Sequence, residues 1–316
     1  MPEVLDRPVL ATLETALVPG KRSRLSPFVE SAQLEVLFGT APDNEQHVES
    51  ARAIVGANRE KIRRMAERWS RFVREGKDFR ANDYSEDAFL DAYPAYYFSV
   101  NVPKVQLVLL DLLCAGRLSG DICLVDVGVG TGTTAVAFLD FLLLAGQSCA
   151  LHGHPFPVRS VRLLGFDRSA GSLRRAEQVI KAYAAALARR IQGRAVVEDS
   201  NTAAADIDLL ARIQGWATES TWRPHDLDAA PLPSDMCGNL IVLGNVLNEL
   251  SDRAREHVTA SLHDLAEEAV VAVIEPGSQG LARQLMRWRR GLVANGSELT
   301  PLVLRSPVFL DTGLGA

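Results

Sequence analysis

The sequence has little that would tie it to an oxidising compartment or to a membrane. Its four cysteines are widely spaced, form no Cys-x-x-Cys pair and mostly lie in apolar segments: Cys114, Cys123, Cys149 and Cys237. Disulfide frameworks and structural zinc sites need paired cysteines, so we expect reduced core residues. The start of the chain shows no charged-then-apolar signal pattern, and the longest apolar stretch, 135–145, is too short to cross a bilayer. These features predict a cytoplasmic protein that is not embedded in a membrane.

An excess of positive charge is also absent. The chain has 39 acidic and 34 basic residues, a formal net charge of -5, so no global field attracts it to phosphate backbones. Nucleic acid could bind only through a local patch. Among the histidines, His152 and His154 share a loop but have no third ligand at a suitable spacing, and we therefore expect no metal.

The first third of the chain has a helical pattern. Apolar residues recur at spacings of three and four over 28–38 and 54–72. Pro94 and Pro103 then bracket an aromatic-rich segment, which is followed by a helix expected over 104–115. We expect residues 1–120 to form an N-terminal helical cap or lid region.

From residue 121 short apolar runs alternate with helices, which is typical of a parallel sheet covered on both faces. Expected strands are 122–127, 161–167, 239–246 and 269–275, with helices over 133–144, 169–192, 253–268 and from 277 to about 293. Between 193 and 235 we expect a short helix near 207–213 and a strand before Trp222. A last strand candidate is 302–305. The fold class is therefore α/β, with a catalytic domain over 121–316.

The strongest motif is the run Asp126-Val-Gly-Val-Gly-Thr-Gly132, which lies between a buried strand and a helix. Glycines at 128, 130 and 132 let the backbone turn tightly and approach a ligand. A dinucleotide-binding G-x-G-x-x-G would need glycine or alanine at Thr133, which disfavours a nicotinamide or flavin cofactor. The alternative is a glycine-rich turn without a ligand.

Polar residues follow each of the other strands, and the carboxyl ends of parallel strands share one edge of a sheet. Asp167 could accept two hydrogen bonds from a ribose diol, or it could cap the helix that starts near Ser169. Asp226, with Asp228 as the fallback, follows the third strand, and the alternative is an acidic surface turn. Asn245, Asn248 and Glu249 follow the fourth strand, where Asn248 and Glu249 could instead cap a turn.

The D-x-G-x-G-x-G run resembles motif I of the class I methyltransferases that use S-adenosyl-L-methionine. The resemblance implies a Rossmann-like sheet whose glycine loop, Gly128, Gly130 and Gly132, cradles the methionine part of the cofactor. Asp126 would help to hold its amino group, and Asp226 would contact the adenine amino group.

The same resemblance places the segment after the fourth strand in the motif IV region, which faces the transferred methyl group. It implies that Asn245 presents its carbonyl to cofactor or acceptor, and that Asn248 or Glu249 orients the acceptor or takes its proton. Tyr97, and with it Tyr93, Tyr96 and Phe98 of the aromatic segment, could stack on an acceptor or exclude water, or could pack the helical region onto the sheet.

NVLNEL (245–250) together with VIEPGS (273–278) and a following basic helix resembles the small-ribosomal-subunit methyltransferase-like family over residues 121–293. Members of that family carry cysteines for an iron-sulfur cluster, and no comparable cluster exists in this sequence.

Three hypotheses follow. The first is a biosynthetic methyltransferase that acts on a small molecule, with an acceptor pocket formed by the N-terminal helices and the aromatic segment; the acidic net charge favours it. The second is an RNA- or ribosome-directed methyltransferase, favoured by the motif likeness and by Arg283, Arg287, Arg289 and Arg290 on one helix. The third is a non-catalytic protein that binds the cofactor. A homodimer is compatible with all three.

Overall fold

The structure is a computed structural model that describes residues 5–18, 25–39, 87–195, 201–234, 236, 238–247, 249–265, 269–275 and 279–294, with scattered residues between 53 and 67. Its sheet has five strands, all parallel, in the order β3-β2-β1-β4-β5. The strands are β1 Gly120–Val127, β2 Val158–Asp167, β3 Thr221–Pro224, β4 Leu240–Gly244 and β5 Val270–Ile274. The predicted α/β, Rossmann-like architecture is confirmed, and the order reverses between β1 and β4.

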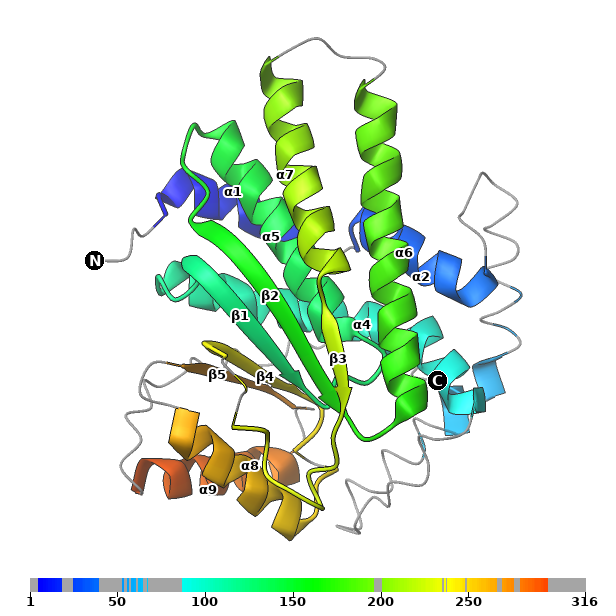
Figure 1. Ribbon diagram of the computed structural model, residues 1–316, viewed down its shortest axis with the longest axis vertical. Helices are drawn as coiled ribbons and strands as arrows, with labels where there is room; N and C mark the ends of the chain where they lie inside the picture. Colours follow the sequence, from blue (N-terminus) through cyan, green and yellow to red (C-terminus); the bar gives the residue numbers. More distant parts are fainter. Residues whose placement is uncertain are drawn as a thin grey trace.

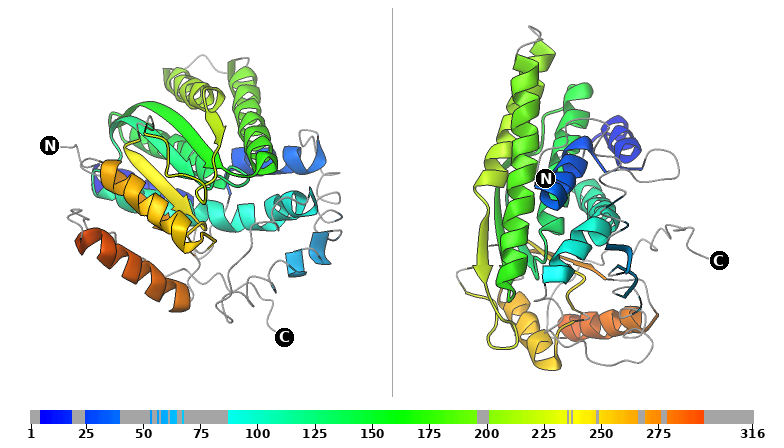
Figure 2. Two further views of the ribbon diagram at one scale, coloured as in Figure 1. Left: turned by 60° about the horizontal axis from the view of Figure 1, so that its bottom comes forward. Right: turned by 90° about the vertical axis from the view of Figure 1, so that its right-hand side faces the viewer.

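Helices cover both faces of this sheet, as predicted (Figure 1 and Figure 2). One face carries α1 Arg7–Leu17, α2 Pro27–Phe38, α4 Asp87–Cys114, α5 Thr133–Leu151, α6 Ala170–Ala195 and α7 Asn201–Thr218. The other carries α8 Asp252–Leu265 and α9 Gln279–Ala294. An apolar core lies on each face of the sheet. Successive side chains of a strand point to opposite faces, so Leu124 packs in the core on the α5 face, while Val125 and Val127 pack in the core on the α8 face.

The N-terminal helices belong to the same core as the sheet. Val9, Leu13 and Leu17 recur along α1 and are buried with residues of α4 and α5 in one apolar cluster. Helix α2 is tied to α6 by Arg189, which donates to Glu35 at 3.0 Å. A domain boundary at residue 120 stays a prediction, but apolar packing is continuous across it.

The helix expected over 104–115 is present, but it begins at Asp87. Both Pro94 and Pro103 lie inside the single helix α4, which spans the aromatic segment and the helix expected after it. Proline cannot donate a helical hydrogen bond, but burial of Phe98 and Val102 holds the helix against the core. The carbonyl of Pro94 accepts a hydrogen bond from Gln33 Nε2 at 2.6 Å.

Other boundaries also differ from the predictions. Helix α5 continues to Leu151, seven residues past the expected end, and α7 is longer than the short helix expected near 207–213. Trp222 lies within β3, not after it. Cys149 is buried as expected, but Cys114 is exposed, and Cys237 and the strand candidate 302–305 lie outside the described residues.

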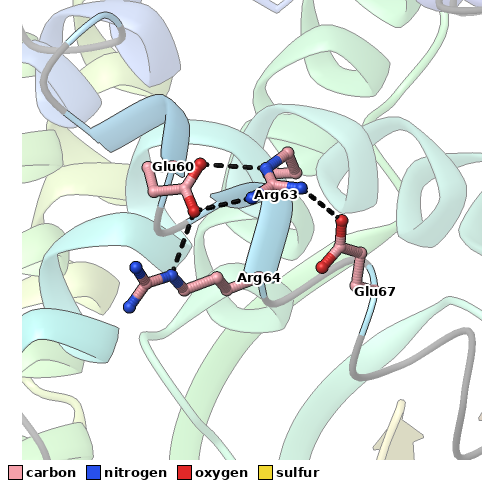
Figure 3. Close-up of polar contacts among 4 residues, drawn as sticks. All are labelled: Glu60, Arg63, Arg64 and Glu67. Atoms are coloured by element: carbon pink, nitrogen blue, oxygen red, sulfur yellow. Dashed lines mark hydrogen bonds and ion pairs between the residues drawn. The ribbon is translucent and has the colours of Figure 1, made fainter.

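Between residues 53 and 67 the described residues are helical and carry an exposed network of ion pairs (Figure 3). Glu60 pairs with Arg63 and Arg64, and Arg63 also pairs with Glu67 at 2.6 Å. Spacings of three and four residues place these side chains on one helical face, as expected. Because they are 45% to 75% exposed, the pairs add little to stability.

In the part of the chain that the structure describes, two helices are long and apolar enough, by length and composition alone, to cross a membrane, contrary to the expectation from 135–145: Tyr93–Cys114 and Thr133–Leu151. They are 56% and 78% buried inside the protein, respectively. Core helices pass the same test, so this is weak support for a membrane location.

A buried carboxylate joins three helices to α5. Asp140 of α5 is fully buried and accepts hydrogen bonds from Ser26, which caps α2, from Gln106 of α4 at 2.9 Å and from Tyr183 of α6 at 3.3 Å. Burial raises the pKa of Asp140 to about 6, against the lowering effect of these donors. The N-terminal helices are therefore fixed by a polar junction as well as by apolar packing.

We expect Asp140→Ala to reduce the free energy of unfolding by about 3 kcal/mol, because three buried donors lose their acceptor. Asp140→Asn keeps an acceptor for two of them and should cost less.

The folded pKa of Asp140 lies above its unfolded value, so the contribution of Asp140 to stability falls as pH rises from about 4 to about 6. In Asp140→Asn this pH dependence should be absent. Urea unfolding at both ends of this window measures the effect, and equal stability of Ala and wild type would contradict it.

Candidate functional site

A cavity of about 600 Å³ lies at the carboxyl ends of the strands, a size typical of small-molecule sites. Its walls come from the ends of β1, β2 and β4, the segment after β3, the start of α6 and the N-terminal part of α4. A second cavity of about 30 Å³ shares Gly128, Gly130, Thr131 and Asn245 with it. In open α/β sheets ligands bind at this edge, next to the strand pair where the order reverses.

The three glycines of the β1 loop all have positive φ, but for different reasons. A Cβ at Gly128 would lie 2.5 Å from Val246 Cγ2, and one at Gly132 would lie 3.0 Å from the Cα of Ala176. A Cβ at Gly130 would meet nothing closer than the Gly128 carbonyl oxygen at 3.9 Å. Packing therefore requires Gly128 and Gly132, whereas Gly130 leaves open space beside the cavity.

Asp167 lies in the cavity wall at the end of β2. Its Oδ2 accepts a hydrogen bond from the Gly130 N–H at 2.9 Å, and its Oδ1 accepts one from the Ser169 N–H at 2.8 Å. The α6 start is capped by Ser169 itself, which accepts from the Ser172 N–H at 3.1 Å. Each carboxylate oxygen of Asp167 keeps a second lone pair for a ligand. Burial raises the pKa of the Asp167 carboxyl group.

Asp126 is 1% exposed, and within the described residues neither of its carboxylate oxygens has a hydrogen-bond partner. The hydroxyls of Thr131, in the adjoining loop, and of Thr133, the first residue of α5, are also buried and unpaired within the described residues. Burial raises the pKa of Asp126 to about 8, with a smaller contribution from the negative charge of Asp167. Buried polar atoms are normally satisfied, so these atoms indicate a place for a polar ligand group or water.

The end of β4 carries an unusual backbone conformation. Asn245 has φ of +57°, the only positive value at a non-glycine among the described residues, and its N–H donates to the Ile274 carbonyl at 2.7 Å. Asn245 lines both cavities, and Glu249 lines the larger one. Asn248 lies outside the described residues.

The aromatic side chain of α4 at the cavity is Tyr93, one of the four aromatic candidates of this segment, and not Tyr97, which the sequence favoured. Tyr93 lines both cavities, whereas Tyr97 lines neither and stacks on Tyr93 with ring centroids 5.3 Å apart. The two residues are one helical turn apart on α4, so a helical reading of this segment would have paired them. Burial, and secondarily Glu249, raises the pKa of Tyr93, whose hydroxyl accepts from Asn101 Nδ2 at 3.2 Å.

The segment after β3 brings His225, Asp226 and Asp228 into the cavity wall. Asp228 pairs with Arg168 at 3.7 Å and accepts a hydrogen bond from Ser251. The Oδ1 of Asp226 accepts only a local bond from the Asp228 N–H at 3.0 Å. Asp226, the first choice of the sequence, is therefore the more available carboxylate.

The cavity wall is acidic on balance. Four carboxylates, Asp167, Asp226, Asp228 and Glu249, face two guanidinium groups, Arg168 and Arg174. Within the described residues no group of three His, Cys, Asp or Glu side chains could hold a metal ion. Such a wall is complementary to a ligand with positive charge.

No protein-family model matches this chain, and no curated protein matches it. Functional inference therefore depends on the geometry of the site.

Because the glycines of this loop are required for different reasons, alanine substitutions at them should lower the free energy of unfolding by different amounts. Gly132→Ala should lower the free energy of unfolding by about 3 kcal/mol, because its Cβ meets the Ala176 backbone at a strained φ. Gly130→Ala should cost about 1 kcal/mol, from the strained φ alone. Gly153, with φ of +68° and open space around it, is the matched control for that strain. Urea unfolding checks the order, and an equal cost at 130 and 132 would refute it.

Asp126→Asn should stabilise the ligand-free protein increasingly as pH rises from about 4 to about 8. The raised pKa means that the folded state binds an extra proton across this window, so ionisation of the buried carboxyl costs stability that asparagine does not lose. The control is Asp121→Asn, at the opposite end of β1. Because the hydrogen bond from Ser160 lowers the pKa of Asp121, this variant should not gain stability over wild type as pH rises. Thermal unfolding against pH measures both variants, and parallel curves for Asp126→Asn and wild type would contradict the prediction.

Proposed function

We propose that this chain is a class I methyltransferase that binds S-adenosyl-L-methionine in the 600 Å³ cavity. One observation carries the proposal: the open turn at Gly130 and the carboxylate of Asp167 meet in a single cavity wall, joined by a 2.9 Å hydrogen bond. A glycine loop left open by its neighbours and an acid at the next strand end are the two features that a nucleoside cofactor needs at this edge.

The residues present fit this cofactor. Asp167 would accept hydrogen bonds from the ribose hydroxyls, and the space over Gly130 would admit the chain that carries the sulfur. The unpaired hydroxyls of Thr131 and Thr133, which line the cavities, offer polar atoms to the amino-acid end, whereas Asp126 lines neither cavity and would act on that end from behind the loop. Asp226 would accept from the adenine amino group.

When bound, the cofactor supplies an electrophilic methyl group on a positively charged sulfur. The task of the protein is then to align the acceptor with that group and to exclude water. The acidic wall favours the positive charge, Tyr93 closes the α4 side of the cavity, and Glu249 can take a proton from an acceptor hydroxyl or ammonium.

We propose a small-molecule acceptor, because carboxylates in the wall repel a phosphate backbone. The RNA-directed alternative is supported by the motif likeness and by Arg283, Arg287 and Arg290, which are exposed on α9. Transfer of labelled methyl groups to a small-molecule extract or to ribosomal RNA separates the two, and steep salt dependence of binding would favour RNA. Labelling of neither would favour the non-catalytic alternative.

Calorimetry with S-adenosylhomocysteine, the demethylated product, tests the shared premise. Asp167→Ala and Gly130→Ala should each weaken binding by about tenfold or more, through loss of the ribose acceptor and through a methyl group in the cofactor's space, respectively. Gly153→Ala, with the same backbone strain outside the cavity, should bind like wild type. Failure of the wild-type protein to bind either the methylated or the demethylated cofactor would overturn the proposal.

A further inference from the structure

The segment after β4, residues 245–250, forms one wall of the cavity through Asn245, Val246, Glu249 and Leu250. We call it the β4 loop; its residue 248 lies outside the described residues. The loop leaves the sheet through the left-handed turn at Asn245, so regular strand pairing cannot hold it beyond that point. Its position must come from other contacts.

Neighbouring elements supply those contacts at Leu247, which is 8% exposed. The Leu247 N–H donates to Glu275 Oε1 at 2.7 Å, and its carbonyl accepts from Arg255 Nε of α8 at 3.1 Å. A buried backbone N–H needs an acceptor, and a carboxylate gives a stronger hydrogen bond than a neutral oxygen. Glu275, directly after β5, and Arg255 of α8 thus hold the loop at the same residue.

The residues on either side of Leu247 transmit this position to the cavity. Val246 packs against Gly128, leaving no room for a Cβ there, and its carbonyl accepts from the Glu249 N–H at 2.9 Å. Asn245 donates to Ile274, the residue before Glu275. The end of β5 therefore fixes both the start of the β4 loop and its centre.

We propose that Glu275 is a positioning residue for the cofactor cavity: it does not line the cavity, but it holds the β4 loop that does. The consequence for cofactor affinity rests on the proposed function. The anchoring of the loop does not, because it can be measured without a ligand.

Glu275→Ala and Glu275→Gln, compared with wild type, test the proposal. In Glu275→Ala, hydrogen exchange at the Leu247 amide should accelerate, and affinity for S-adenosylhomocysteine should fall, each by about tenfold. Glutamine has a side chain of the same length with a carbonyl acceptor. In Glu275→Gln, both the exchange rate of the Leu247 amide and the affinity for S-adenosylhomocysteine should therefore lie within about threefold of wild type.

The matched control is Asn239→Ala, at the opposite end of β4. Asn239 accepts from the Cys123 N–H at 2.9 Å and donates to the Asp121 carbonyl at 2.8 Å, so its loss also removes side-chain bonds to backbone. It should lower the melting temperature and leave Leu247 exchange and product affinity unchanged.

Three outcomes would overturn the inference: unchanged Leu247 exchange in Glu275→Ala, faster exchange with undiminished product affinity, or no rescue by Glu275→Gln. Failure of the wild-type protein to bind the product would instead overturn the proposed function. Leu247 exchange would then decide by itself whether Glu275 anchors the loop.

Discussion

The hydrogen bond from the Gly130 N–H to the Asp167 carboxylate joins the turn after β1 to the end of the neighbouring strand β2. The same carboxylate accepts from Ser169 at the start of α6, and the main-chain carbonyl of Asp167 accepts from the His225 N–H after β3 at 3.0 Å. One residue thereby sets the relative positions of three cavity walls. Parallel strands bring these walls to one edge of the sheet, and Asp167 determines how they meet there.

Departures from ordinary protein structure are concentrated at this edge. The left-handed Asn245, the positive φ of Gly130 and the unpaired, buried Asp126 all lie within or beside the cavity walls. Each is unfavourable for folding, and the regular sheet and its two apolar cores compensate for them. Functional sites are where such local rules are normally broken. The structure therefore gives the proposed cofactor site a physical basis apart from the sequence motif.

Sequence patterns were sufficient for four of the five strands and for the place of Asp167 beside the glycine loop. Buried apolar runs located β1, β2, β4 and β5, and the position of Asp167 at a strand end placed it beside the glycine loop. The path of α4 through Pro94 and Pro103 was not predictable from local propensity, because tertiary burial overrides it. For that reason Tyr97 was chosen from the four aromatic candidates, whereas Tyr93 is the one that lines the cavity. The contact between Glu275 and Leu247 depends on how two loops meet in space, which no spacing in the sequence encodes.

The most direct test of the central claim is an experimental structure of the complex with S-adenosylhomocysteine. The account predicts ribose hydroxyls within hydrogen-bonding distance of the Asp167 carboxylate, the amino-acid chain over Gly130 and the adenine near Asp226. A product molecule bound elsewhere, or one whose sugar makes no contact with Asp167, would contradict it.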